Sequence, residues 1–464
     1  MLVFAVYFVL ALIFGAKPIL DTTKIEPAKA LSPNYYLGIS KEPGFKIVSK
    51  SALTIKIALR SLFRRKSATI RILLCLTTVF ILVTVAVAGG IIADQTTKGW
   101  VEKAIGKDMV VIAHKEMCNQ YRLLLSKFHK VEEISQFNYT EDKYLLSDEL
   151  PNWLNQISGI LGIEMRLILE AQIREVPGYI LNSETGAHIS IGDRREGVSL
   201  IVGVEPEKVL TNWFLEGEFL KKDKSWEAVI GDSIAHKMFT LPLKQELIVF
   251  GRESNRFFNV TGVCVDPLNN GNVTYVPLKD LQNVTGISKI NLILVKIEAS
   301  SNRTEVLNRI SVKVAEVNED YEVFELNQIL EENIGFLDYV WSTILFLPLF
   351  SLASASLCLM CYIMLILIEQ RQEFGVLRAL GAKPKTVLEI VSWQSLIVLL
   401  SSCALGIAFG IIMTLLILVP EPLVTGFTIM EIAGWLLMAL AATFVFSLYP
   451  AIKFSKKSLI QIMT

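Results

Sequence analysis

The stretch IRILLCLTTVFILVTVAVAGGIIA, residues 70–93, contains a single charged side chain, Arg71. A helix rises about 1.5 Å per residue, so roughly 20 mostly apolar residues cross the hydrocarbon core of a bilayer. Three further segments, 339–368, 390–419 and 429–450, meet the same requirement. We therefore expect an α-helical membrane protein with four long transmembrane helices.

The overall composition agrees with membrane spans beside a soluble domain. Of the 464 residues, 52% are hydrophobic and 19% are charged, whereas a soluble protein carries roughly a quarter charged residues. The formal net charge is zero. No basic surplus is present to neutralise phosphates, so nucleic acid is not an expected partner. The six cysteines are too few and too scattered for a disulfide framework.

Residues 1–16 form a shorter apolar run that begins at the initiator Met. No basic residues precede this run, as they would in a signal peptide. Cleavage after it would also leave the basic residues of 50–71 on the outer side. We expect 1–16 to be an extra, short transmembrane segment, followed by a cytoplasmic linker and a basic helix over 17–69.

Positively charged segments beside the spans mark the cytoplasmic side of a membrane protein. Three such segments alternate consistently with four spans: the approach 50–71, the loop 369–389 and the tail 451–464. The short turn 420–428 contains Glu421 and no basic residue. The loop and the tail are therefore predicted to lie in the cytoplasm, and the region between the first two spans outside.

The approach to the first span has the pattern of an amphipathic helix. Ile55, Leu59 and Leu62 share one face, and basic residues follow one another at every fourth position on another. This pattern predicts a helix lying in the membrane interface. A positively charged flank that only sets the topology is the alternative. The candidate membrane-surface residues are Lys56, Arg60, Arg64, Arg65 and Lys66.

The region 94–338 lies between the first span and the three spans of 339–450, and it has mixed composition. Near its start, strand and helix patterns at 108–113 and 119–134 precede a short strand candidate near 136–140. We predict a large α+β extracytoplasmic domain. The first span, if it continues into this region, and the second span are longer than the bilayer core, so both are predicted to extend outward as helical stalks.

The same order of elements recurs at the far end of this region, with a strand at 291–297, a helix at 304–317 and a strand at 321–326. The two ends are therefore predicted to form one α/β core. The middle, about 141–288, is expected to be an inserted subdomain rich in β-strands. Its strand signals are SLIVGV, EAVIGD, ELIVFG, FFNVTGVCVD and TYVPL.

The outer region lacks the residue patterns of a catalytic or metal site. Its four histidines lie far apart, and no G-x-S-x-G motif is present. We therefore expect that this chain is not an enzyme and holds no metal. Cys118 and Cys264 are both placed outside and could form a disulfide, although two separate thiols are the default. All five N-x-[ST] sequons also fall in this region.

Within the spans, Gly406-x-x-x-Gly410 indicates either close helix packing or a lipid-facing surface that tolerates small residues. Cys358 and Cys361 have the spacing of a redox motif but no His or carboxylate beside them, so packing is the expected role. Charged residues are almost absent from the spans. Ion-driven carriers need such charges, so energy for transport is expected to come from elsewhere.

The loop between the second and third long spans contains EQRQEFGVLRALGAKPKT, residues 369–386. A phosphate-binding loop needs G-x-x-x-x-G-K-[ST] after a strand, and neither the glycine spacing here nor the preceding membrane helix fits. The residues favour a short helix instead, with Phe374, Leu377 and Leu380 as an apolar ridge. Gly381 fits a C-cap, and Pro384 blocks continuation. Such a ridge is expected to dock into a groove of another protein.

The motif E-x-R-x-E-F-G-V-L-R-A-L-G-A-K in this loop closely resembles the signature of FtsX/MacB-type ABC transporter permeases. Further similar segments are IALRSLFRRKSATIR before the first span, SLYPAIKFSKKSLIQI at the end, and IVGVEPEKV, EGEFL and AVIGDSIAHKMF in the outer domain. The resemblance covers about residues 50–464. An alternative for 1–16 is that the chain is the C-terminal half of a duplicated permease.

The resemblance implies a dimer, with itself or with a similar permease, and two copies of a separate ABC ATPase that binds ATP and Mg. No cofactor is then expected on this chain. Residues 371–382 would be the coupling helix that fits the ATPase cleft. The implied coupling residues are Glu369, Arg371, Glu373, Phe374, Gly375, Leu377, Arg378, Ala379, Leu380 and Gly381.

The function implied is export or extraction of a lipoprotein, lipid, peptide or drug-like substrate, driven by movement of the stalk and outer domain. The alternative is a regulator that transmits ATPase strokes to an extracytoplasmic partner, such as a cell-wall hydrolase, without moving a substrate. In either case the chain would reside in the cell membrane as a multi-pass protein in contact with lipid.

Overall fold

The computed structural model describes residues 50–130, 137–181, 188–223, 225–298, 302–417, 422 and 424–456. The expected extra span at 1–16, most of the linker and the tail from 457 onward lie outside these residues. The chain divides into two compact units. The outer unit comprises Asp94–Val340, and the helical unit comprises the residues before and after it.

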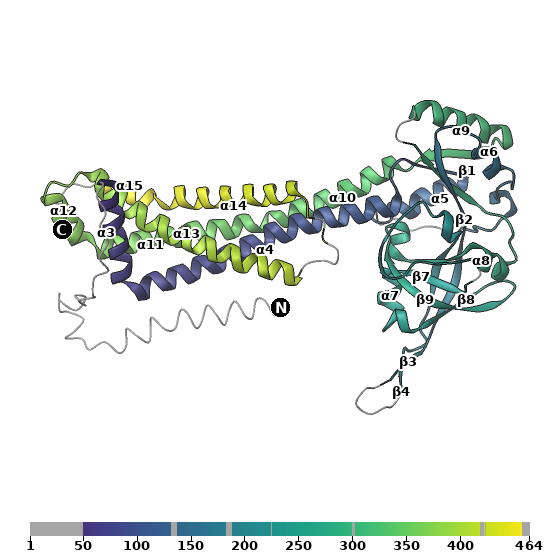
Figure 1. Cartoon of the computed structure of the whole chain (residues 1–464), viewed down its shortest axis with the longest axis horizontal. Coiled ribbons are helices and arrows are strands. Elements are labelled where there is room, and N and C mark those ends of the chain that lie inside the picture. The colour runs from purple at the N-terminus through teal and green to yellow at the C-terminus, as the bar shows by residue number, and fades with distance from the viewer. Residues whose placement is uncertain are drawn as a thin grey trace. The chain divides into compact units, whose positions relative to one another are not determined.

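The helical unit contains the expected bundle of apolar helices (Figure 1). Among the described residues, four helices are long and apolar enough to cross a membrane: Lys66–Ile105, Asn327–Glu369, Pro384–Ile417 and Gly426–Ser455. The four predicted spans are therefore confirmed as helices, although residues 418–419 lie outside the described part. The helices of this unit are α3 (Lys50–Arg64), α4 (Lys66–Ile105), α11 (Leu347–Glu369), α12 (Arg371–Ala379), α13 (Pro384–Ile417), α14 (Gly426–Ser447) and α15 (Tyr449–Ser455).

Helix α13 approaches α4 closely at two glycines. A Cβ atom on Gly406 would lie 2.4 Å from Cβ of Phe80, and one on Gly410 would lie 2.5 Å from Cβ of Thr84. Only hydrogen fits at these positions, so the Gly-x-x-x-Gly motif is a packing interface rather than a lipid-facing stretch. Buried hydroxyls nearby donate to the carbonyl four residues earlier, as that of Thr84 does to Phe80. Each such hydroxyl thus has a hydrogen-bond partner within its own helix.

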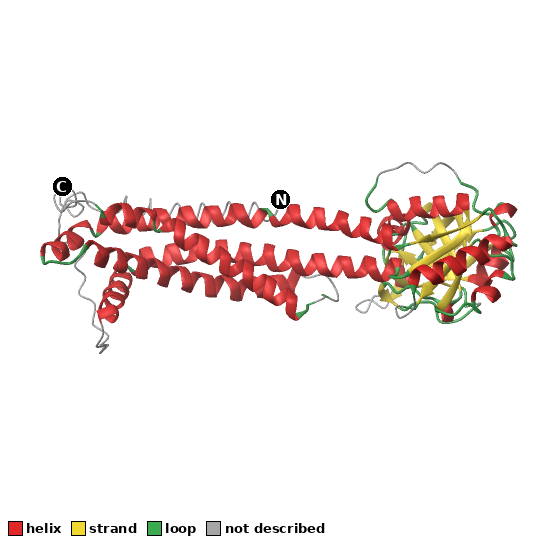
Figure 2. Cartoon of the chain, turned by 90° about the horizontal axis from the view of Figure 1, so that it is seen from above, coloured by secondary structure: helices red, strands yellow, loops and turns green. Residues whose placement is uncertain are grey.

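The outer unit is built on one large sheet (Figure 2). In the described part its ten strands run in the order β12-β1-β11-β2-β5-β10-β7-β9-β6, and β8 pairs with β2 and β9. The strands are β1 (Met109–His114), β2 (Ile160–Val176), β5 (Glu196–Val204), β6 (Phe214–Gly217), β7 (Glu227–Gly231), β8 (Glu246–Phe250), β9 (Asn255–Val265), β10 (Val273–Pro277), β11 (Leu292–Ile297) and β12 (Tyr321–Glu325). A separate hairpin pairs β3 (Gly178–Leu181) with β4 (His188–Ile191).

Helices pack against this sheet, as Figure 2 shows. They are α5 (Lys115–Ser126), α6 (Leu150–Leu154), α7 (Asp232–Met238), α8 (Leu278–Thr285) and α9 (Arg303–Val317). Helix α10 (Asn327–Leu345) follows β12 and leads away from the sheet (Figure 1). Short 3₁₀ turns occupy Asp142–Tyr144, Pro206–Lys208, Pro242–Lys244 and Leu268–Gly271. The long helix α4 also reaches into this unit, since it runs without a break over 40 residues.

The two ends of the outer region form one core, as predicted. Strand β1 lies between β11 and β12 and is antiparallel to both. The predicted helix at 304–317 is α9, whereas the one predicted at 119–134 begins and ends earlier, as α5. The strand expected near 136–140 is absent from the described residues 137–140, where the side chain of Asn138 accepts hydrogen bonds from the backbone N–H and hydroxyl of Thr140 and holds a turn.

The middle region is rich in strands, as expected, but apart from the β3–β4 hairpin these strands belong to the same sheet as the core. Strand β2, which the sequence did not indicate, pairs with β11 on one side and β5 on the other and joins the two regions. Apart from that hairpin, the described strands of residues 141–288 therefore do not form a sheet separate from the core. Charged residues interrupt the apolar pattern of β2 because Glu164 and Arg166 pair inside the core, with Nε 2.6 Å from Oε1.

A second polar cluster in the outer unit surrounds Asp266. Its carboxylate accepts hydrogen bonds from Nε1 of Trp213 at 2.7 Å and from the hydroxyl of Tyr275 at 2.5 Å. Burial is the main influence on this carboxyl, and it raises the pKa of Asp266 above its usual range. Cys118 and Cys264 are buried and unpaired, so the default of two separate thiols is correct. Burial raises the pKa of Cys118 to about 12.

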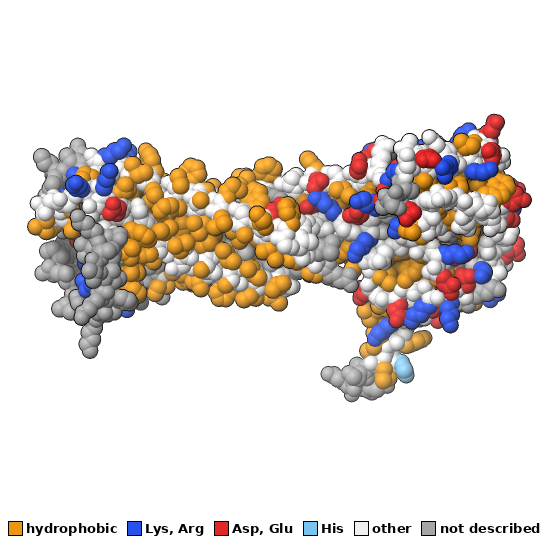
Figure 3. All heavy atoms as spheres, turned by 45° about the horizontal axis from the view of Figure 1, so that its top comes forward, with side chains coloured by type: hydrophobic (Ala, Val, Ile, Leu, Met, Phe, Trp, Pro, Cys, Tyr) orange, Lys and Arg blue, Asp and Glu red, His pale blue; other side chains and the backbone are white. Residues whose placement is uncertain are grey.

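The two units differ in the surface that they present (Figure 3). Hydrophobic side chains cover the helical unit, whereas charged side chains of both signs are dispersed over the outer unit. Large apolar residues of α13 and α14 are strongly exposed, among them Leu416 and Met430. A surface of this kind is unfavourable in water and suits contact with lipid chains.

Candidate functional site

The loop between α11 and α13 carries the short helix expected from its sequence. Helix α12 spans Arg371–Ala379, and the chain then reverses at Gly381, whose φ is +96°. The N–H of Ala382 donates to the carbonyl of Leu377, and the N–H of Gly381 donates to that of Arg378. This pair of bonds is the Schellman arrangement, which needs a left-handed residue at Gly381. Pro384 then occupies the first position of α13.

The apolar ridge of α12 faces its own bundle over part of its length, and in this respect the prediction is wrong. The side chain of Phe374 is 2% exposed and lies edge-on to the ring of Phe454 in α15. Leu377 packs beside it, half-buried, against the same cluster. Phe374 and Leu377 lie one turn apart, so the face that carries them points inward. Leu380, 81% exposed, and Val376, 54% exposed, are the apolar side chains that α12 and its cap expose.

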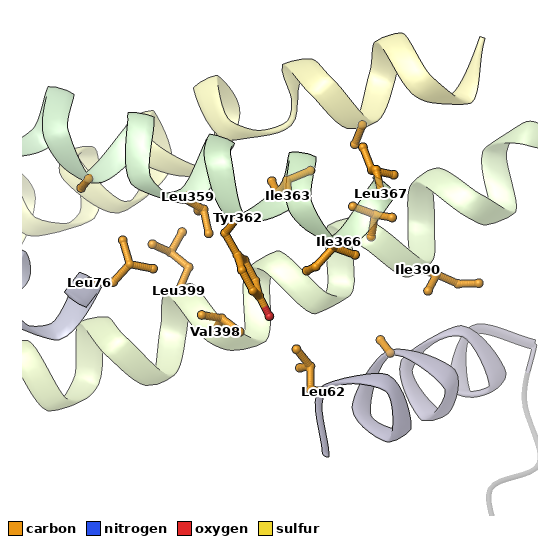
Figure 4. Close-up of a cluster of buried hydrophobic side chains, with 14 of the residues drawn as sticks. Leu62, Leu76, Leu359, Tyr362, Ile363, Ile366, Leu367, Ile390, Val398 and Leu399 are labelled. Atoms are coloured by element: carbon orange, nitrogen blue, oxygen red, sulfur yellow. The ribbon is translucent and has the colours of Figure 1, made fainter. Parts of the chain in front are cut away.

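Helix α3 packs against the same end of the bundle. In Figure 4, Leu62 of α3 points toward the cluster that contains Ile366 of α11 and Val398 of α13. The face of α3 that packs against the bundle is formed by Ala58 and Leu62; of the predicted apolar row, Leu62 belongs to it and Leu59 does not. Ala58, a small residue, permits close approach to the bundle.

The opposite apolar residues of α3 remain outside the bundle. Leu59 is 37% exposed and Phe63 is 62% exposed. Of the basic residues predicted on the membrane surface, Arg60, Arg64 and Lys66 are exposed, and Lys56 and Arg65 are half-buried.

Polar contacts connect the end of α3 to the loop. Arg64 forms an ion pair with Glu373, and Arg65 forms one with Glu369. The amide Nε2 of Gln370 donates to the hydroxyl of Ser61. Two of the expected coupling residues, Glu369 and Glu373, are therefore engaged by the chain's own basic helix.

The remaining predicted coupling residues lie in α12 or directly after it. Gly375 is buried next to Phe374, Arg378 is half-buried, and Arg371, Ala379 and Gly381 are exposed. Lys383 and Lys385, which follow the helix, are exposed as well. The outward surface of the loop is thus basic with an apolar centre.

Sequence reasoning missed three residues of this site: Ser61, Gln370 and Phe454. The first two are uncharged and carry no motif, and their contact follows only from the way α3 folds back on α11. Phe454 lies one position after Lys453, in the basic tail whose charges predicted only that it is cytoplasmic. Within the described residues, no group of three or more His, Cys, Asp or Glu is arranged to hold a metal ion.

Two family models match separate parts of the chain. Residues 345–459, which include α12, match the FtsX-like permease C-terminal model, and residues 141–312 match the MacB-like periplasmic core domain. The chain belongs to the FtsX/MacB family of permeases. The permease is therefore a multi-pass protein of the cell membrane, with its large α+β unit on the extracytoplasmic side.

Solved structures similar to the permease cover about half of it. The periplasmic region of MacB from Actinobacillus actinomycetemcomitans is 17% identical, with a TM-score of 0.34 over 50% of the permease and 94% of that chain. The extracellular domain of the noncanonic ABC-type transporter YknZ from Gram-positive bacteria is 13% identical, with a TM-score of 0.31 over 47% and 100% of the two chains. No curated protein matches the permease significantly.

Membership of this family makes the chain a permease subunit of an ABC-type transporter of the MacB/FtsX kind. The family implies an ATPase partner.

Proposed function

We propose that this permease docks a separate ATP-binding subunit at α12 and passes the movement of that subunit through its helices to the outer unit. The observation that carries this proposal is the pair Val376 and Leu380. These apolar side chains are exposed at the centre of a charged cytoplasmic loop, where exposure to water is unfavourable. A groove on a partner would bury both, in the manner of a helix-in-groove contact. ATP and Mg would bind to the partner.

The interior of the helical unit supports an external energy source. Among its described residues, the buried polar side chains of the spans are Thr, Ser and Gln, with no buried Asp, Glu, Lys or Arg. An ion-driven carrier uses such charges along its path. Hydrolysis in the partner would instead supply the energy to export or extract a lipoprotein, lipid, peptide or drug-like substrate. The complex would contain two ATP-binding subunits and two permeases.

Co-purification from membranes tests the docking site. Val376→Asp and Leu380→Asp should each weaken recovery of the ATP-binding subunit, because a carboxylate would have to be desolvated in the partner's groove. Val312→Asp is the matched control: Val312 is an equally exposed apolar residue on α9 of the outer unit. Recovery that is equal for all three variants would contradict the docking site. Phe374→Asp is not a clean test, since Phe374 belongs to the permease's own core.

Reconstitution in vesicles separates transport from regulation. Transport predicts that a substrate added on the outer face accelerates ATP hydrolysis by the complex. If hydrolysis instead responds only to an added extracytoplasmic protein, with no molecule moved, the complex is a regulator of that protein.

A further inference from the structure

We propose that α3 is a working part of the docking site: it holds α12 in the orientation in which α12 meets the ATP-binding subunit. This inference rests on the proposed function. It assigns to Arg64, Arg65 and Ser61 a positioning role on α12. For the two arginines, this role replaces the membrane-surface role that the sequence indicates.

The contacts of α3 fall at the joint between α11 and α12. That joint is a single residue, Gln370, whose backbone (φ −100°, ψ 10°) leaves the helical range and whose side chain is almost fully buried. Its amide binds Ser61, while the carboxylates of Glu369 and Glu373, one residue before and three after it, bind the two arginines. Helix α3 therefore contacts the joint itself and the residues on both sides of it, Glu369 and Glu373.

Helix α12 needs such support because it is short. It contains nine residues, and an isolated helix of fewer than about 12 residues is unstable in water. On its inner face Phe374 inserts beside Phe454, which fixes the distance of α12 from the bundle. Leu377 packs beside it against the same cluster, so the inner face of α12 is held by apolar contacts that carry no directional bond. The ion pairs with α3, on the exposed edge of α12, would restrict rotation of α12 against the bundle.

The same contacts set the charge that a partner encounters. With Glu369 and Glu373 neutralised by arginines, the exposed charges that follow Leu380 in the loop are those of Lys383 and Lys385. The surface therefore fits an acidic rim around an apolar groove on the ATP-binding subunit. If α3 moved away, the carboxylates of Glu369 and Glu373 would lose their counter-charges and add two negative charges to this surface.

Charge reversal and charge exchange test the positioning role in the complete complex. Arg64→Glu/Arg65→Glu should lower permease-dependent ATP hydrolysis about fivefold, the size expected from losing two half-exposed ion pairs. The ATP-binding subunit should still co-purify, since Val376 and Leu380 are unchanged. Adding Glu369→Arg/Glu373→Arg to the same protein should restore hydrolysis to within about twofold of the wild type, because the ion pairs re-form with reversed sign.

Lys456→Glu is the matched control for these variants. Lys456 is an exposed basic residue at the end of α15, and among the described residues it forms no hydrogen bond or ion pair with α12. It should leave hydrolysis unchanged. Wild-type hydrolysis in the reversed variant, or no recovery in the exchanged one, overturns the inference while leaving the docking proposal intact.

Amide hydrogen exchange supplies a test that does not need the partner. In the permease alone, Arg64→Glu/Arg65→Glu should accelerate exchange over residues 371–380, and the exchanged variant should restore protection. If the wild-type permease retains no ATP-binding subunit, the proposed function fails, but this measurement still decides the inference. Unchanged exchange in the reversed variant means that α3 does not hold α12.

Discussion

Single buried polar residues carry much of the specificity of this fold. Arg166 and Glu164 lie two positions apart on β2 with side chains 2% and 0% exposed. The guanidinium also donates to the hydroxyls of Tyr121 and Thr211, and the second carboxylate oxygen accepts from the N–H of Leu210 at 2.7 Å. Every charged atom of the pair thus has a protein partner, which is the condition under which burial of charge is tolerated.

Removal of one partner should therefore be costly. Arg166→Met leaves the carboxylate of Glu164 buried without its counter-charge, and we expect a loss of about 3–5 kcal/mol in the free energy of unfolding of the outer unit. Adding Glu164→Gln removes the charge and keeps an acceptor for Leu210, so the double variant should recover part of this loss. Thermal unfolding measures both. A double variant that is less stable than the single one would contradict the argument.

Asp266 gives the outer unit a pH dependence of known sign. Burial raises the pKa of its carboxyl in the folded state above the unfolded value. The folded state then holds more protons, so this contribution is full below the unfolded pKa and is lost as pH rises through the folded pKa. Asp266→Asn removes it. The melting temperature of the variant, relative to wild type, should increase from pH 4 to pH 7, and a decrease would be inconsistent with the sign.

Gln394 is the opposite case to Arg166. It lies fully buried in α13, and neither amide atom has a hydrogen-bond partner among the described residues. An unpaired buried amide costs about 1–3 kcal/mol. Gln394→Met, similar in volume, should therefore raise the thermal stability of the detergent-purified permease. Gln394→Glu is the contrasting variant and should lower it. A loss of stability in Gln394→Met would show that the amide has a partner outside the described residues.

At the scale of elements, hydrophobic patterns located most of the structure but did not decide which partner each face meets. The four spans and strands such as β10 and β11 were predictable because almost every residue of these elements is apolar and is either buried or lipid-facing. Strand β2 was missed because its charged pair also depends on Tyr121, Thr211 and Leu210, which are distant in sequence. The apolar ridge of α12 was predicted to dock into a groove of another protein. Periodicity shows that a helix face is apolar, but it does not show what covers that face.

The interface between α4 and α13 can be tested with two glycines of opposite surroundings. Gly406→Ala places a Cβ 2.4 Å from Cβ of Phe80 and should destabilise the bundle, since neither backbone can yield. A Cβ on Gly434 in α14 meets nothing within 4 Å. Gly434→Ala should therefore gain up to about 1 kcal/mol from helix propensity. Thermal stability in detergent distinguishes the two, and a common sign would contradict the packing.

At the scale of the molecule, the permease combines a core whose surface suits lipid with a core whose surface suits water. The helical unit buries large apolar side chains such as Phe80 and leaves others outside, whereas the outer unit buries its apolar side chains together with charged residues such as Arg166. The two cores belong to separate compact units. Their stabilities should therefore respond separately to substitution.

Buried thiols report on each core. Cys118 and Cys264 lie in the outer unit and Cys403 lies in the helical unit. On heating, Arg166→Met should lower the temperature at which Cys118 and Cys264 react with an alkylating reagent and leave that of Cys403 unchanged. Gly406→Ala should do the reverse. A common shift of all three would show that the two units unfold as one.

The placement of β1 beside β12 has a consequence for how the outer unit bears a load. The chain enters the sheet from α4 through β1 and leaves through β12 into α10, and Val110 is paired with Glu325, so both junctions lie at the same end of neighbouring antiparallel strands. Arg303 joins the two junctions by ion pairs to Asp108 and Glu325. A pull shared by both helices loads no bond between these strands. A pull that draws the two junctions apart loads the ladder from this one end, so the bonds between β1 and β12 would open one after another.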